Sequence, residues 1–80
     1  EGHRFALEVL QLSLRRRMLR LVAGGVKDAA QIGEALKLSL SLAEYHLSML
    51  EKALVIERFE DGWRATSTGR LFLEKVEGRA

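Results

Sequence analysis

Apolar positions recur with helical spacing between residues 39 and 54, and the other predicted elements are arranged around this segment. Ala43, Leu47, Leu50 and Leu54 follow one another at intervals of four, three and four residues. Because an α-helix turns once in about 3.6 residues, these four side chains lie along one face. The segment is therefore predicted to be an amphipathic helix with one apolar stripe.

Two serines are candidates for the start of this helix. Ser41 precedes Glu44 by three residues, which is the spacing of a capping box, and Leu40 and Tyr45 are placed for a hydrophobic staple across the same turn. Ser39 is the alternative cap. The first turn is therefore predicted to within about two residues.

Two helices are expected in the N-terminal part of the chain. Residues 4–12 carry a broad apolar face, and residues 14–23 continue the helical period. Ser13 either caps the second helix or lies inside one continuous helix. Gly24-Gly25 is expected to end the second helix in the left-handed conformation that glycine favours.

A short helix over residues 29–36 is predicted next, with Asp28 as its N-cap. Ile32 and Leu36 are expected to face inward. Lys37 then opens the turn to the long helix, at a position where many helix-turn-helix units have glycine. We expect Lys37 to adopt a φ angle that is open to any residue.

The Asp61-Gly62 dipeptide lies between two β-prone runs and predicts a hairpin with a type I′ turn. Closure through these two residues would pair Glu60 with Trp63. The residues expected to share the inner face of the hairpin are Ile56, Trp63 and Ala65.

A last helix is expected after the hairpin, because an apolar stripe follows three possible capping residues. The caps are Thr66, Ser67 and Thr68, and the stripe consists of Leu71, Phe72 and Val76. Helix, tight turn, helix and hairpin is the order of a winged helix-turn-helix. The predicted fold is a mostly helical α+β domain of this type, with a two-stranded β-hairpin wing and a C-terminal helix.

The length of the chain allows one domain, assigned to residues 1–80, in which residues 1–3 are set aside as an expression remnant or disordered. A domain of this size buries only about 60–65% of its unfolded surface, so its stability is expected to be modest. The sequence has no cysteine, which excludes disulfides and thiolate-bound zinc. Association with a second copy is the expected reinforcement.

Composition and motifs exclude several function classes. The net charge of +2, from 13 Lys and Arg against 11 Asp and Glu, says little about nucleic acid. No apolar run approaches about 18 residues and no signal peptide is evident, so a cytoplasmic protein without membrane contact is expected. His3 and His46 have no metal-ligand spacing, and neither a phosphate-binding glycine loop nor a catalytic grouping occurs. We expect a non-enzyme without metal or cofactor.

Several short motifs occur in the order known from one protein family. They are Arg15 to Leu21, Ile32 to Leu36, Leu38-Ser39, Tyr45-His46-Leu47 with Leu50, Leu54 with Ile56, and Thr66 with Gly69. Together they make residues 14–69 resemble the winged helix-turn-helix of ArsR-like transcriptional regulators, especially compact archaeal forms.

The resemblance implies a homodimeric transcriptional regulator that binds a pseudo-palindromic DNA operator. Its recognition helix, residues 40–53 or so, would enter the major groove, with the wing, about 55–66, at the backbone. His46 would be semi-buried between the recognition helix and the core. The DNA-contacting residues expected here are Arg16, Arg20, Lys37, Leu40, Ser41, Glu44, Tyr45, Ser48, Arg58 and Arg64, with Arg15 and Arg17 as further phosphate contacts. The expected dimer interface comprises Phe5, Val9, Leu10, Leu12, Leu71, Phe72 and Val76.

Two groups of arginines have alternative roles. The cluster over residues 15–20 either forms a solvated helix surface or contacts phosphates, and Arg16 and Arg20 share one face. Arg58 and Arg64 either straddle the DNA backbone or pair with acidic residues across the hairpin.

The sequence departs from the family pattern at the expected DNA face. Leu40, Leu42 and Glu44 stand where the family often has Arg, Thr or Gln, Ala53 replaces the usual glycine before the wing, and the wing tip, 60–62, is acidic. These departures favour an alternative function, a protein–protein interaction module that docks through Leu40, Leu42 and Glu44. The sequence indicates neither the operator nor an effector.

Overall fold

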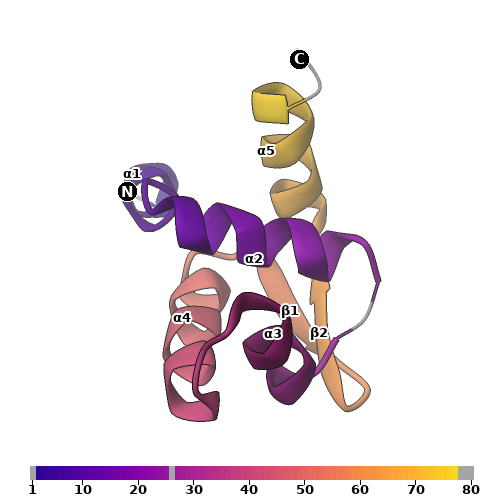
Figure 1. Cartoon of the computed structure of the whole chain (residues 1–80). Helices are drawn as coiled ribbons and strands as arrows, with labels where there is room; N and C mark the ends of the chain where they lie inside the picture. Colours follow the sequence, from indigo (N-terminus) through magenta and orange to yellow (C-terminus); the bar gives the residue numbers. More distant parts are fainter. Residues whose placement is uncertain (1, 26, 78–80) are drawn as a thin grey trace.

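The computed structural model describes residues 2–25 and 27–77, which form five helices and one hairpin (Figure 1). The predicted winged helix-turn-helix order is confirmed. In chain order the elements are α1 (Gly2–Val9), α2 (Ser13–Ala23), α3 (Ala29–Leu36), α4 (Leu40–Lys52), β1 (Ile56–Phe59), β2 (Gly62–Ala65) and α5 (Ser67–Glu77).

Helix α2 runs through the middle of the molecule. It packs against α3, α4, α5 and β2, and Figure 1 shows α3, α4 and the hairpin on one side of it and α5 rising from the other. Met18, Leu19 and Val22 on α2 are completely buried. The core therefore forms around α2, and the helix-turn-helix and the wing project together from one side of it.

The apolar stripe of α4 is confirmed for three of its four members. Ala43, Leu47 and Leu50 are fully buried, but Leu54 is 68% exposed. The helix ends at Lys52, and Leu54 lies beyond it with a left-handed φ of 65°. This conformation turns the chain toward the wing and takes Leu54 out of the helical register on which the prediction rested.

Ser39, the alternative cap, begins α4. Its Oγ accepts a hydrogen bond from the backbone N–H of Leu42 at 3.2 Å. The predicted capping box of Ser41 and Glu44 is therefore wrong. The staple of Leu40 and Tyr45 is wrong with it, since both side chains are 53% exposed.

Helix α3 has the predicted cap and an unexpected end. Asp28 and Gln31 form a reciprocal capping box, with N···O distances of 2.8 and 2.9 Å. At the other end Lys37 is left-handed (φ 61°, ψ 47°), and the N–H of Leu38 donates to the carbonyl of Gly33 at 2.8 Å. Lys37 thus takes the conformation of the family's glycine, contrary to the expectation of an ordinary φ.

Helices α1 and α2 are separate. Ser13 is the first residue of α2 and not its cap, because Leu12 holds the capping position without a side-chain hydrogen bond. The predicted left-handed ending is wrong for Gly24, which stays right-handed at φ −78°. A positive φ, 152°, occurs one residue later at Gly25.

The wing has the predicted inner face but a different register. Phe59 pairs with Gly62, so the loop is Glu60-Asp61 and not Asp61-Gly62. Glu60 has a positive φ of 55° and Asp61 does not, which excludes the type I′ turn. The register differs from the predicted one by two residues, and a shift of two keeps every side chain on its face. The inner face is therefore confirmed, with exposures of 8% or less for Ile56, Trp63 and Ala65.

Gly62 is needed for a close backbone approach rather than for a turn. Lys27 and Trp63 exchange backbone hydrogen bonds of 3.2 and 2.8 Å, which adds a bridge to the outer edge of β2. A Cβ atom at Gly62 would lie 2.5 Å from the carbonyl oxygen of Lys27. Glycine is therefore required at position 62 by the neighbouring backbone of Lys27, and not by the type I′ turn on which the prediction of the hairpin rested.

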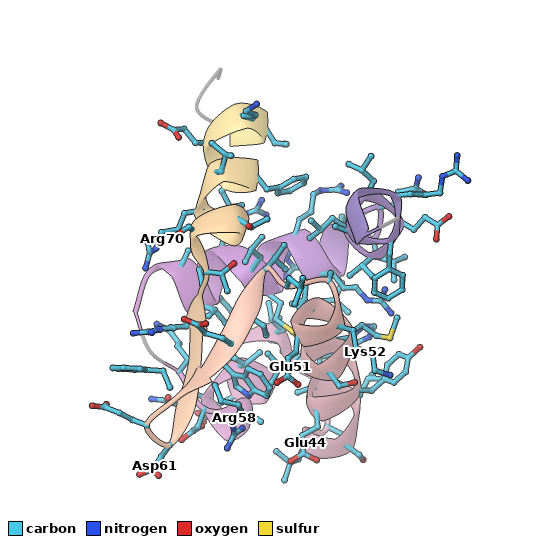
Figure 2. All side chains as sticks on the ribbon, turned by 180° about the vertical axis from the view of Figure 1, so that it is seen from behind. Glu44, Glu51, Lys52, Arg58, Asp61 and Arg70 are labelled. Atoms are coloured by element: carbon cyan, nitrogen blue, oxygen red, sulfur yellow. The ribbon has the colours of Figure 1, made fainter. Side chains whose placement is uncertain are left out.

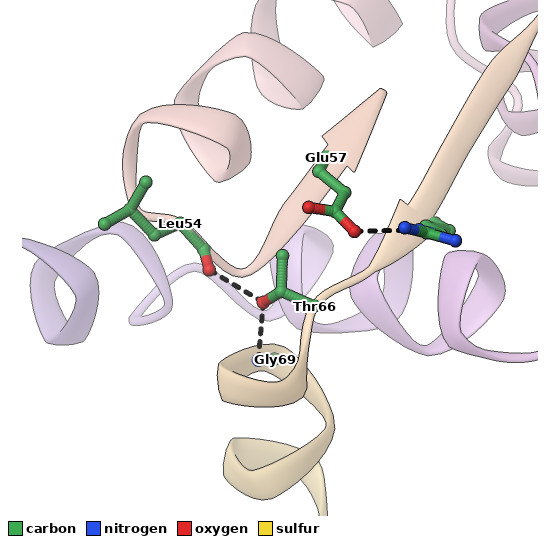
Figure 3. Close-up of polar contacts among 5 residues, drawn as sticks. Leu54, Glu57, Thr66 and Gly69 are labelled. Atoms are coloured by element: carbon green, nitrogen blue, oxygen red, sulfur yellow. Dashed lines mark hydrogen bonds and ion pairs between the residues drawn. The ribbon is translucent and has the colours of Figure 1, made fainter. Parts of the chain in front are cut away.

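Thr66, one of the three predicted caps, begins α5 and ties it to the end of α4. Its Oγ1 accepts from the N–H of Gly69 at 3.0 Å and donates to the carbonyl of Leu54 at 2.7 Å (Figure 3). A Cβ atom at Gly69 would overlap the carbonyl of Val55. These contacts orient α5 relative to α4 and the wing.

The left-handed conformation of Lys37 predicts that Lys37→Gly raises the stability of the domain. The conformation costs a non-glycine residue about 1–2 kcal/mol, and the greater unfolded-state entropy of glycine returns roughly 0.5–1 kcal/mol of this. A net gain of about 0.5–1 kcal/mol should raise the thermal midpoint by about 4 °C. Circular dichroism melts measure it.

Ala35→Gly is the matched control, since Ala35 is exposed inside α3 with helical geometry. It should lower the stability by about 1 kcal/mol. A Lys37→Gly variant that is destabilised as much as Ala35→Gly would contradict the left-handed conformation.

Candidate nucleic-acid interface

Helix α4 presents a polar stripe opposite its buried face. The helical period places Ser41, Tyr45, Ser48 and Lys52 along this stripe, with Glu44 beside it. All are exposed except Ser48, which is half-buried and donates its Oγ hydrogen bond to the carbonyl of Tyr45 at 2.9 Å. Of the residues predicted to read DNA, those on α4 therefore share an accessible surface.

The inner side of α4 is fixed by a buried arginine. Arg15 on α2 is 7% exposed, and its Nε donates to Nδ1 of His46 at 3.1 Å. Its guanidinium also donates to the carbonyl of Val9 at 3.4 Å and lies 5.8 Å from the centre of the Tyr45 ring. Arg15 therefore joins the end of α1 to the recognition helix, and the expected position of His46 between helix and core agrees with this geometry.

The neighbouring arginine performs a similar task at the end of α1. Arg16 donates to the carbonyls of Leu10 and Gln11 at 2.6 and 2.9 Å, where the positive charge also complements the helix C-terminus. Arg15 and Arg16 thus both form hydrogen bonds within the domain. Arg17 and Arg20 remain at the surface, beside a hollow between α2 and α3.

Both wing arginines are held against neighbouring side chains. Arg64 pairs with Glu57 at 2.7 Å and its guanidinium lies 4.1 Å from the centre of the Phe59 ring. Arg58 lies on the opposite face of the hairpin, 4.8 Å from the centre of the Trp63 ring. The alternative of pairing across the hairpin thus applies to Arg64, while Arg58 is an exposed cation with a fixed orientation.

Charge is distributed unevenly over the chain. Residues 28–61, which comprise the helix-turn-helix and the first half of the wing, contain seven acidic and three basic residues, a formal charge of −4. The remainder has ten basic and four acidic residues, or +6. Figure 2 shows Glu44 on α4 and Asp61 at the wing tip, with Arg58 between these elements. The small net charge therefore conceals an acidic segment and a basic remainder.

The residues predicted for a dimer interface fall into two groups. Val9 and Leu10 are 2% and 3% exposed, so they belong to the core of one protomer. Leu12, Leu71 and Val76 are about half exposed, and Phe5 and Phe72 are half-buried. An apolar groove of about 350 Å³ lies between α1 and α5, lined by Leu7, Leu71, Phe72 and Val76 among others.

Two further observations concern ligands and membranes. Among residues 2–25 and 27–77, no group of three or more His, Cys, Asp or Glu side chains is arranged to hold a metal ion. Within the same residues, every helix is too short or too polar to cross a bilayer.

Sequence reasoning missed three features of the interface. Lys52 continues the outward stripe of α4, which the spacing of seven from Tyr45 could have revealed. Lys27 borders the wing through backbone hydrogen bonds, which side-chain patterns do not report. The bond between Arg15 and His46 spans 31 residues, and no local signal predicts it.

These features define a winged helix-turn-helix domain, a class of DNA-binding domain. Residues 13–57 match the arsR family of bacterial regulatory proteins, and the chain belongs to this family. It is therefore a DNA-binding transcriptional regulator and not an enzyme.

The fold is also that of a solved domain from Mycobacterium bovis. The NMR structure of a homodimeric winged helix-turn-helix DNA-binding domain, from a possible ArsR-family transcriptional regulator, superposes with a TM-score of 0.83. The two share 24% sequence identity over 98% of this chain and 79% of the other. The comparison with curated proteins found no match.

The contact between Arg15 and His46 predicts a loss of stability on acidification. Burial, and secondarily the charge of Arg15, lower the pKa of His46 from its usual value. The unfolded chain therefore binds a proton more readily, so the free energy of unfolding should fall as the pH drops below about 6.5. Urea unfolding between about pH 7.5 and 5 measures it.

His46→Gln is the control, because an amide retains an acceptor and does not titrate. The variant should show a flatter stability profile between about pH 7 and 5 than the natural chain. Identical profiles of unfolding free energy against pH for the two chains would show that His46 does not contribute to the pH dependence of stability.

Proposed function

We propose that this domain binds a pseudo-palindromic DNA operator as a homodimer in the cytoplasm. Helix α4 enters the major groove in each half-site, and the wing lies at the sugar–phosphate backbone. The observation that supports this most directly is the exposed polar stripe of α4. The opposite face of the helix packs on the core and is bonded to Arg15, so the stripe is the side that remains accessible to DNA.

The proposed contacts follow from exposure. Leu40, Ser41, Glu44, Tyr45 and Ser48 face the bases, and the cations Lys37, Lys52 and Arg58 face phosphates. Arg20 remains a phosphate contact at the edge of the domain, and Arg64 contributes only weakly since Glu57 neutralises it. Arg16 is left out of the proposed set because its guanidinium is bonded to the carbonyls of the turn between α1 and α2.

The proposed dimer forms through the apolar groove between α1 and α5. Leu71 and Val76 present about half of their surface to solvent there, and a second copy would cover them. Leu12, before α2, is about half exposed as well. A small domain gains stability from such burial. The solved domain of the same fold from M. bovis is described as homodimeric, which supports the proposal.

A protein-docking role is the second candidate function. Leu40 and Leu42 on α4 are 53% and 44% exposed beside the acidic Glu44, and residues 28–61, to which α4 belongs, carry a formal charge of −4. A protein partner with a basic, apolar surface would fit this face. The same experiment distinguishes the two functions.

Fluorescence anisotropy of a labelled mixed-sequence duplex, at about 50 and about 200 mM salt, tests DNA binding. Four cations per protomer, Arg20, Lys37, Lys52 and Arg58, give roughly eight phosphate contacts per dimer, so the affinity should fall on the order of 10⁴-fold between these conditions. Arg58→Ala should reduce the salt slope by about two in the dimer. Arg70→Ala, on α5 (Figure 2), should leave the slope unchanged. No binding even at low salt would favour the protein-docking function.

Sedimentation over about 1–100 μM protein tests the dimer. We expect the natural chain to form a dimer. Leu71→Lys should make this dimer dissociate at a higher protein concentration, since the introduced charge in the groove must be desolvated on association. Leu42→Lys alters a leucine of similar exposure on α4 (44% against 51% for Leu71) and should leave the mass unchanged. A natural chain that stays monomeric throughout this range would disprove the dimer.

A further inference from the structure

One acidic side chain dominates the first two turns of α4. Residues 40–48 of this helix contain a single formally charged side chain, the carboxylate of Glu44. Glu44 is exposed, and among the described residues it has no ion pair or hydrogen-bond partner. In Figure 2 it lies near the end of α4 that is farthest from Lys52.

No cation of α4 offsets this charge. Lys52 follows Glu44 by eight residues, which is about 12 Å along the helix axis. That separation exceeds the Debye length of about 8 Å at physiological salt, so the attraction between these two exposed groups is weak. Arg58 on the wing is stacked on Trp63. In a complex that displaces water from the Glu44 carboxylate, its hydrogen-bond donor would therefore come from the bound molecule.

The major groove of DNA offers a carboxylate few partners. Phosphates, guanine and thymine edges present acceptors, which repel it. Adenine presents an amino donor beside the N7 acceptor, which suits an amide better than a carboxylate. Cytosine presents only its N4 amino donor and therefore matches a group that accepts without donating.

We propose that Glu44 is a specificity-determining residue that accepts a hydrogen bond from the N4 amino group of a cytosine in each operator half-site. The proposal rests on the DNA-binding function proposed above. The same carboxylate opposes binding to DNA that lacks a cytosine at this position, because it then faces acceptors without compensation. Glu44 thus contributes in two ways, by attraction at the operator and by repulsion elsewhere.

Glu51 provides a matched control on the same helix. It follows Glu44 by seven residues, so it lies on the same side of α4 two turns further on. It is also exposed and unpaired among the described residues. Because base contacts come from the N-terminal part of a recognition helix, Glu51 faces the backbone and affects all DNA sequences alike.

The experiment begins with selection of binding sites from a randomised duplex pool by the full chain. Anisotropy then compares the selected duplex with two modified forms, one in which the preferred C·G pair becomes T·A and one in which 2-pyrimidinone, which lacks the amino group, replaces cytosine. The natural chain should lose about 10-fold to 100-fold in affinity for both.

Glu44→Gln should lower the affinity for the selected duplex, which contains the preferred cytosine, and raise the affinity for random duplex. Its affinity for random duplex should rise several-fold because a repulsive charge is removed, and its base preference should move from cytosine to adenine, which a glutamine amide can contact through N6 and N7. Glu51→Gln should raise the affinity for random and selected duplexes alike and keep the cytosine preference. Both positions are exposed, so thermal melts should confirm unchanged folding.

Different results would disprove the role of Glu44 and DNA binding itself. Selected sites without a fixed cytosine, or a Glu44→Gln variant that keeps the cytosine preference, would overturn the role of Glu44 while DNA binding stands. If the natural chain binds no duplex at about 50 mM salt, DNA binding itself is disproved and the proposal falls with it.

Discussion

The orientation of the recognition helix depends on the buried guanidinium of Arg15. A single side chain on α2 reaches the carbonyl of Val9, the last residue of α1, and the imidazole of His46 on α4, so three helices meet at one charged group. Burying this charge is costly, and the contacts to Val9, His46 and Tyr45 offset the cost through hydrogen bonds and the aromatic ring. Loss of any of these partners would leave the charge unsatisfied, so the arrangement resists partial change.

This interaction also lies between the surface proposed for dimerisation and the surface proposed for DNA binding. The groove between α1 and α5 is the proposed dimer interface, and the outer face of α4 is the proposed DNA interface. Arg15 contacts the end of α1 and the inner side of α4, while Thr66 joins the end of α4 to the start of α5. Each terminal helix is therefore joined by a specific hydrogen bond either to α4 or to the segment that directly follows it.

Local patterns predicted the elements well, and non-local contacts explain the failures. The spacing of Ala43, Leu47 and Leu50 identified the buried face of α4, because burial imposes the helical period. The same spacing included Leu54, which fails because the chain reverses in a left-handed conformation one residue after Ala53. The register of the wing depends on the close approach of the Lys27 backbone to Gly62. Such a contact between distant residues leaves no local pattern in a single sequence. The site was predicted by position and resemblance, but which arginines remain available is decided by contacts inside the fold.

That division of the arginines accounts for the character of the DNA face. Arg15, Arg16 and Arg64 are bonded within the domain, so three of the thirteen Lys and Arg residues hold helices and the wing together. What remains beside α4 is a small set of cations around an acidic residue. With few cations beside α4, base contacts determine how far the specific affinity exceeds the non-specific affinity. For such a surface the unpaired carboxylate of Glu44 is consistent with selective DNA binding, because it penalises every sequence that offers it no donor.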